Sequence, residues 1–218
     1  MPTPFITIKE NSTNEMIIKK SRFITQLIRV ENLESAQEHL AEIKKNHLKA
    51  NHSCWAVIIN TIPVTERSSD DGEPSGTAGL PMLEVLRKKQ LTNILAVTTR
   101  YFGGIKLGSG GLIRAYAGSI SESLATTTLV IRELFFAQIV TISYSQHATV
   151  TNFLDQHLEF YLQDTQYLAD VTLTIMVKEN EQELFANELT NLLQGSVTIK
   201  KGPAQNFERD LPLDYFSK

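Results

Sequence analysis

The sequence has one cysteine, one tryptophan and no long apolar run, and each scarcity excludes a class of protein. The single cysteine, Cys54, cannot form an internal disulfide and cannot by itself build a cysteine-rich zinc site. No stretch approaches the ~18 consecutive apolar residues that a membrane-spanning helix requires. The first residues, MPTPFITIKE, lack the basic start and apolar middle of a secretory signal, so we expect a cytoplasmic protein that does not enter a membrane.

Extreme composition and extreme charge are also missing. The 218 residues are 42% hydrophobic and 21% charged, close to the average of globular proteins, and can bury one large core or two small ones. Residues 1–132 hold 16 basic and 12 acidic residues, a net charge of +4. Residues 133–218 hold 5 and 12, a net charge of −7, which gives −3 for the whole chain. The first part therefore permits contact with phosphate groups, although it lacks the strongly basic stripe of a dedicated nucleic-acid binder.

The histidines and the cysteine do not form a pattern typical of a metal or catalytic site. The sequence HSCWAVIIN predicts a strand in which His52 and Cys54 share one face. A catalytic pair is one interpretation, but a cysteine nucleophile also needs a base and an oxyanion site, and the sequence shows neither. We favour a small core cysteine, with Trp55 on the opposite face of the strand. The other four histidines have no partners at metal-ligand spacing, so we expect no metal and no cofactor.

Glycine is concentrated in one place, because nine of the eleven glycines lie in residues 68–118. This density predicts two shaped loops, since glycine allows positive φ angles and close approach of a ligand to the backbone. The first, which we call the acidic loop, is residues 70–79, before a predicted helix at residues 80–89 with Pro81 in its first turn. Its candidate site residues are Asp70, Asp71, Glu73, Ser75 and Thr77.

The second loop, which we call the basic loop, is residues 100–111. It follows the apolar run NILAVTT and precedes a helical pattern, and this order of strand, glycine loop and helix is typical of anion binding. Ser109 is the expected N-cap, and small residues after it leave the first helical N–H groups uncovered. The candidate anion-binding residues are Arg100, Gly103, Gly104, Lys106, Gly108, Ser109, Gly110, Gly111 and Arg114. The spacing fits neither a P-loop nor a dinucleotide-binding loop.

Periodicity predicts the remaining elements of the first part. We expect strands at residues 4–10 and 16–30, paired as a hairpin with a turn near residues 11–14. A helix is expected at residues 33–48, with an apolar face formed by Leu33, Ala36, Leu40, Ile43 and Leu48. The helix after the basic loop is expected to bury Ile113, Tyr116, Ala117, Ile120 and Leu124.

The second part of the chain has the order βαββαβ, which predicts a separate α/β sandwich. Its expected elements are strand 135–144, helix 147–158, strands 159–167 and 170–178, helix 181–193 and strand 196–202. We therefore predict domains at residues 1–130 and 134–205, and a loosely ordered tail at residues 206–218. Because the second domain is acidic and lacks an RNP-like aromatic motif, we do not expect it to bind RNA directly.

Two long motifs resemble one known family. SDDGEPSGTAG followed by TRYFGGIKLGSGGLIRAY is similar to the signature of the IMPACT family, whose bacterial members are the YigZ-like proteins. The resemblance implies an α+β protein of two domains. The first would be an α/β sandwich like the second domain of ribosomal protein S-five, and the second a ferredoxin-like βαββαβ sandwich. Eukaryotic members of the family regulate translation, which implies a similar setting for this chain.

Three functional interpretations are compatible with these residues. In the first, a regulatory binding protein contacts RNA, the ribosome or a translation factor through Arg100, Lys106 and Arg114, with Tyr101 or Phe102 as a stacking surface. In the second, an enzyme acts on a phosphorylated or nucleotide-like ligand with a divalent metal held by the acidic loop. In the third, the glycines serve packing alone. For the acidic loop itself we favour ion pairs with the basic loop, and we expect the two loops to lie side by side.

Overall fold

The computed structural model describes residues 4–212 and 215, and it divides the chain into two compact units. Among the described residues, the N-terminal unit comprises Phe5–Ile131 together with residues 209–212 and 215, and the C-terminal unit comprises Arg132–Glu208 together with Pro4. No helix within the described ranges is long and apolar enough to cross a membrane. The described strands form two sheets, and each unit has its own apolar core.

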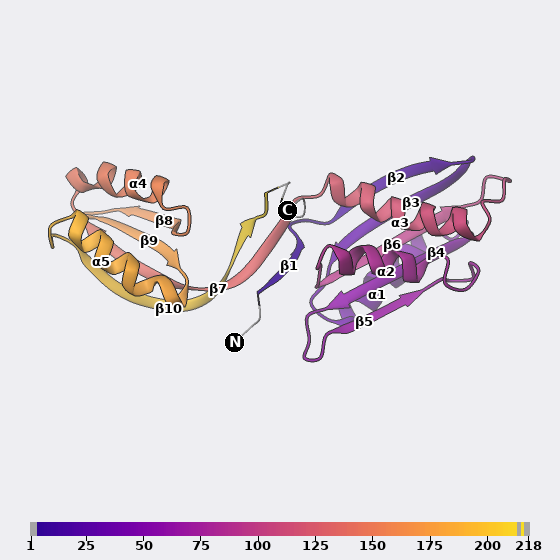
Figure 1. Cartoon of the computed structure of the whole chain (residues 1–218), viewed down its shortest axis with the longest axis horizontal. Coiled ribbons are helices and arrows are strands. Elements are labelled where there is room, and N and C mark those ends of the chain that lie inside the picture. Colours follow the sequence, from indigo (N-terminus) through magenta and orange to yellow (C-terminus); the bar gives the residue numbers. More distant parts are fainter. Residues whose placement is uncertain (1–3, 213–214, 216–218) are drawn as a thin grey trace. The chain divides into compact units, whose positions relative to one another are not determined.

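The N-terminal unit is built on an antiparallel sheet covered on both faces (Figure 1). Its strand order is β2-β3-β6-β4-β5, with β2 at Ser12–Ile18, β3 at Ser21–Arg29, β4 at His52–Ile59, β5 at Thr65–Ser69 and β6 at Ile94–Tyr101. Helices α2 (Gly79–Lys88) and α3 (Ser109–Ala125) pack on one face, and α1 (Leu33–Asn46) packs on the other.

Strand β6 explains why the sheet needs helices on both faces. Its residues alternate between two cores: Ile94 and Ala96 pack with α2 and α3, whereas Leu95 and Val97 pack with α1. All four side chains are at most 1% exposed. The uninterrupted apolar run of the sequence therefore corresponds to a central strand that is buried on both sides.

The predicted hairpin between residues 4–10 and 16–30 is wrong. Strand β1 (Phe5–Ile8) pairs instead with β7 (Leu129–Ile142), and the hairpin partners are β2 and β3. Their turn is formed by Lys19 and Lys20, which both have positive φ, at 46° and 65°. Such turns usually carry asparagine or glycine, so two lysines gave no turn signal in the sequence.

Two apolar residues assigned to buried helix faces are exposed. Leu48 lies beyond the end of α1 and is 84% exposed. Ile113 is 42% exposed, and Leu112 is buried in its place because α3 starts at Ser109 and turns Leu112, Ala115 and Tyr116 toward the sheet. The prediction for α3 is confirmed at Tyr116, Ile120 and Leu124, which are buried, and is wrong at Ile113, while Ala117 is only partly buried.

The C-terminal unit has the predicted βαββαβ order. After β7 come α4 at His147–Gln156, β8 at Tyr161–Tyr167, β9 at Val171–Val177, α5 at Gln182–Leu192 and β10 at Thr198–Asp210, with short 3-10 helices at Tyr144–Gln146 and Glu179–Glu181. The second sheet has the order β1-β7-β9-β8, with β10 also paired with β7, and its strand β1 belongs to the N-terminal unit. Phe153 of α4 and Phe185 of α5 share one core with Leu173 of β9. The predicted α+β class with two sheets is confirmed.

The predicted loose tail at residues 206–218 is wrong over its first part. Strand β10 continues to Asp210, and Leu211 is buried in the core of the N-terminal unit. The backbone N–H of Leu211 donates to the carbonyl of Leu129 at 2.8 Å. The C-terminal segment therefore returns to the first unit. Residues 213–214 and 216–218, also assigned to the tail, lie outside the described residues.

Candidate functional site

Asp70 of the acidic loop caps helix α2. Its carboxylate accepts N–H bonds from Gly76 at 2.8 Å and from Ala78 and Gly79 at 2.9 Å each. Partial burial raises the pKa of this carboxyl, but the three backbone donors outweigh that effect and hold the pKa below its usual value. The first N–H groups of a helix need such acceptors, so Asp70 has a structural role.

The carboxylate of Asp71 is also engaged within the chain. It contacts Lys44 Nζ at 2.6 Å and the backbone N–H of Ser53 at 2.7 Å. The carbonyl of Asp71 lies 2.9 Å from Nδ1 of His52 and accepts a hydrogen bond when Nδ1 carries the proton. These contacts attach the acidic loop to α1 and to the start of β4.

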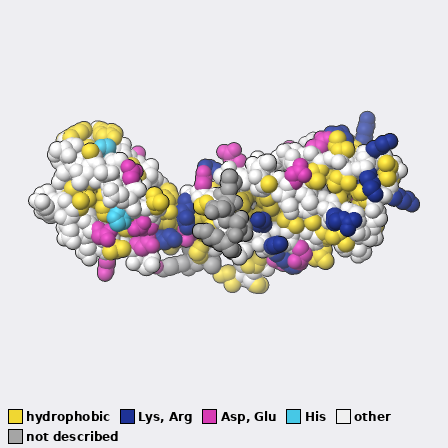
Figure 2. Space-filling model, turned by 45° about the horizontal axis from the view of Figure 1, so that its top comes forward, with side chains coloured by type: hydrophobic (Ala, Val, Ile, Leu, Met, Phe, Trp, Pro, Cys, Tyr) yellow, Lys and Arg dark blue, Asp and Glu magenta, His cyan; other side chains and the backbone are white. Residues whose placement is uncertain are grey.

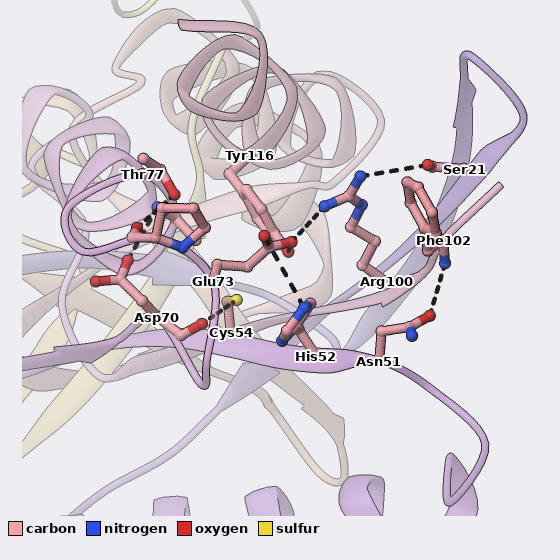
Figure 3. A network of polar contacts seen from close by, with 12 residues as sticks. Ser21, Asn51, His52, Cys54, Asp70, Glu73, Thr77, Arg100, Phe102 and Tyr116 are labelled. Atoms are coloured by element: carbon pink, nitrogen blue, oxygen red, sulfur yellow. Dashed lines mark hydrogen bonds and ion pairs between the residues drawn. The ribbon is translucent and has the colours of Figure 1, made fainter. Parts of the chain in front are cut away.

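Glu73 forms a buried ion pair with Arg100 (Figure 3). Its Oε1 accepts from Arg100 Nη1 at 2.6 Å and from the Tyr116 hydroxyl at 2.8 Å, while Nε2 of His52 lies 4.0 Å from Oε2. The side chains of Glu73 and Arg100 are only 4% and 6% exposed. A buried charge of this kind is tolerated because it is paired and hydrogen-bonded.

Arg100 therefore does not present its charge to solvent, which corrects its assignment to the anion-binding surface. It lies in β6 rather than in a loop, and its guanidinium contacts the rings of Phe23 and Phe102, 5.3 and 5.5 Å from their centroids. Its Nη2 also donates to Ser21 Oγ at 3.4 Å. The expected ion pairing between the two loops holds for Glu73 and Arg100.

The other acidic-loop candidates offer little to a ligand. The Thr77 hydroxyl is buried and donates to the carbonyl of Pro74 at 2.6 Å, while Ser75 is exposed. Within the described part of the chain, no cluster of histidine, cysteine, aspartate or glutamate could hold a metal ion. The donor chemistry thus does not fit a divalent cation, because the carboxylates of Asp70, Asp71 and Glu73 already have internal partners.

Cys54 is a core residue. It is 0% exposed, and its Sγ donates to the carbonyl of Asp70 at 2.9 Å. Burial raises the pKa of this thiol to about 12. Because the thiolate is the reactive form, Cys54 is unsuited to nucleophilic catalysis.

We expect the folded protein to resist thiol-specific reagents at pH 8, since a thiol with a pKa of about 12 stays protonated there. The test is the absorbance change with a chromogenic disulfide reagent, followed with and without urea. One thiol per chain should react only after unfolding. Rapid reaction of the folded chain would show that the thiol is accessible and more acidic than its surroundings imply.

Helix α3 begins one residue earlier than predicted. Its N-cap is Gly108, with φ 71° and no side-chain hydrogen bond, so the assignment of Ser109 as N-cap is wrong. Ser109 is the first helical residue and is exposed, as is Gly110. Only glycine adopts the positive φ at this cap without strain, which explains why the chain carries glycine rather than a polar cap here.

Lys106 and Arg114 are exposed, and no ion pair involves either of them among the described residues. Two further cations, which the sequence analysis missed, lie beside the basic loop. A Cβ added to Gly103 would lie 2.0 Å from the backbone carbon of Lys20, so the loop is in contact with the turn formed by Lys19 and Lys20. Two adjacent lysines were visible in the sequence, but only the strand pairing brings them to this loop.

The chain that follows α1 reaches the same end of the sheet. Oδ1 of Asn51 accepts a hydrogen bond from the Phe102 N–H at 2.8 Å, and the backbone N–H of Asn51 donates to the carbonyl of Arg100 at 2.9 Å. Lys49 lies two residues before Asn51 and is exposed. We call the exposed cations at this end of the unit the basic end: Lys19, Lys20, Lys49, Lys106 and Arg114. Figure 2 shows Lys and Arg side chains gathered over the tips of β2 and β3.

Comparison with protein families matches both units. Residues 19–124 match the family described as "Impact N-terminal domain", and residues 140–196 match "Domain of unknown function (DUF1949)". The chain is 42% identical over 205 residues to "IMPACT family member YvyE" of Bacillus subtilis (strain 168), covering 94% of each chain. It is 33% identical over 184 residues to "IMPACT family member YigZ" of Escherichia coli (strain K12), covering 84% of this chain and 90% of that one.

A solved structure is also similar over most of the chain. It is titled "Crystal structure of an hypothetical protein", is 30% identical, and covers 90% of this chain and 96% of its own. The TM-score is 0.57. This likeness supports the two-unit α+β architecture.

Proposed function

The chain belongs to the IMPACT family, and we propose that it is a translation-associated binding protein that contacts RNA, free or within the ribosome, through the basic end. One observation carries the proposal. The basic end gathers five exposed cations from three separate segments, and across the described residues no ion pair engages any of them. Unpaired cations on one surface attract phosphate groups.

The acidic loop does not cancel this charge, although it lies nearby. Asp71 is paired with Lys44, and Glu73 is paired with Arg100. Asp70 directs its carboxylate toward three backbone N–H groups of its own segment. Because these carboxylates already have partners within the chain, they do not pair with the cations of the basic end, which stay available to a negatively charged ligand.

The connection with translation is what the resemblance to the IMPACT family implies for this chain. Phosphate contacts position a nucleic acid without reading its sequence, so the basic end supports recognition of RNA as a class. A translation factor with an acidic surface is the competing partner, and the experiment below distinguishes it.

The test measures binding of a fluorescent RNA to the parent chain and to Lys106→Ala, Arg114→Ala and the double variant. Each single change should weaken binding several-fold for every RNA tested, because each removes one phosphate contact. Lys200→Ala is the matched control, since Lys200 is an exposed lysine of the C-terminal unit. If the variants bind the RNA as the parent does, the basic end does not contact nucleic acid and a protein partner becomes the better proposal.

A further inference from the structure

Phe102 is a large aromatic residue presented at the surface among the cations of the basic end. It follows the last residue of β6 and is 46% exposed, although most phenylalanines are buried. Its backbone N–H donates a hydrogen bond to Oδ1 of Asn51, and the backbone N–H of the next residue, Gly103, donates to Ser21 Oγ at 3.2 Å. The segment that carries the ring is thus held by two hydrogen bonds, and Figure 3 shows the one between Asn51 and the Phe102 N–H.

The Phe102 ring also contacts the guanidinium of Arg100. The guanidinium of Arg100 lies 5.5 Å from the Phe102 centroid and 5.3 Å from that of Phe23, so one cation contacts both rings. Glu73 fixes the guanidinium in turn. Phe102 is therefore an exposed ring in contact with a buried cation whose position is fixed by an ion pair.

The neighbouring aromatic residue is not available in the same way. The hydroxyl of Tyr101 lies 2.8 Å from Nδ1 of His47, and Arg22 lies over its ring at 5.5 Å from the centroid. Tyr101 is only partly exposed. Of the two stacking candidates, Phe102 is the one that leaves a ring surface open.

We propose that Phe102 stacks an unpaired nucleobase, so that the N-terminal unit prefers single-stranded or bulged RNA to a regular duplex. This inference rests on the proposed function. Bases in a duplex are already stacked and paired, whereas unpaired bases can lie on an aromatic ring whatever their sequence. The backbone of Lys20 contacts Gly103, and Lys106 follows in the same loop, which places cations for the flanking phosphates.

The experiment compares an unstructured RNA of about 12 nucleotides with a blunt duplex of the same sequence. Phe102→Leu keeps an apolar cover over Arg100 but removes the ring, and Phe102→Trp keeps a ring. Phe102→Leu should weaken single-strand binding about ten-fold and duplex binding less than two-fold, whereas Phe102→Trp should bind the single strand as the parent does. The salt dependence should not change in either variant, because stacking on a base releases no counterions.

A purely structural role for Phe102 gives a different pattern. In that case Phe102→Leu would weaken the binding of both RNAs by the same factor, or would leave single-strand binding unchanged. Either result overturns the inference. Thermal unfolding of both variants shows whether a loss of RNA binding comes from lower stability of the fold or from the missing aromatic ring. If the parent binds both RNAs equally and Phe102→Leu changes neither, only this inference fails. If the parent binds neither RNA, the proposed function fails with it.

Discussion

Replacing Glu73 by alanine should lower the free energy of unfolding by about 3–5 kcal/mol, because it leaves the Arg100 guanidinium buried without its counter-charge. Both side chains are less than a tenth exposed, and the pair is joined by a direct bond of 2.6 Å. The change also removes the acceptor of the Tyr116 hydroxyl, which is itself buried. A buried donor without an acceptor adds to the loss.

Urea unfolding followed by circular dichroism measures this effect. Glu66→Ala is the matched control, since Glu66 pairs with Arg87 and their side chains are 29% and 41% exposed. A surface pair of this kind contributes about 1 kcal/mol or less, so the control should unfold close to the parent.

A second variant separates an uncompensated charge from lost packing. The double change Glu73→Leu with Arg100→Met removes both charges and should recover much of the stability lost in Glu73→Ala. If Glu73→Ala lowers the free energy of unfolding no more than Glu66→Ala does, the buried pair contributes no more than a surface pair.

Replacing Gly103 by alanine should cost about 3 kcal/mol of stability, because the added methyl group has no space. It would lie 2.0 Å from the carbonyl carbon of Lys20 and 2.1 Å from its oxygen, and both atoms belong to backbone that cannot rotate away. The turn of Lys19 and Lys20 would have to move, so RNA binding should weaken as well.

Gly118→Ala is the control for Gly103→Ala, measured by the same urea unfolding. Gly118 lies inside α3, and an added Cβ would meet no atom within 4 Å. Alanine there should raise the free energy of unfolding by about 0.5–1 kcal/mol, because glycine is a poor helix former. A Gly103→Ala variant as stable as the parent would mean that the loop and the turn are not in contact.

Local pattern predicted much of the fold. The 3.6-residue period located α1, α3, α4 and α5, and the change of period near residues 125–133 preceded the βαββαβ order of the C-terminal unit. The errors lie where distant segments decide the outcome. Strand β1 pairs with β7, more than a hundred residues away, and no alternation within residues 4–30 could reveal that partner.

The candidate site was likewise predicted only in part, because local pattern locates its loops but not the distant residues that contact them. Glycine density located both loops, and the Glu73–Arg100 pair lies between their segments. The burial of Arg100 depends on Phe23 and Tyr116, which come from β3 and α3, so the sequence could not show it. The cations Lys19 and Lys20 became visible only when the β2–β3 turn was found against Gly103.

The most direct test of the central claim is the salt dependence of RNA binding by the parent chain and by Lys106→Ala. If Lys106 meets a phosphate, the slope of log K against log salt concentration should become shallower by about 0.7–0.9, because one fewer counterion is released. Lys200→Ala should keep the parent slope. Equal slopes for the parent and Lys106→Ala would contradict the assignment of the basic end as the RNA contact.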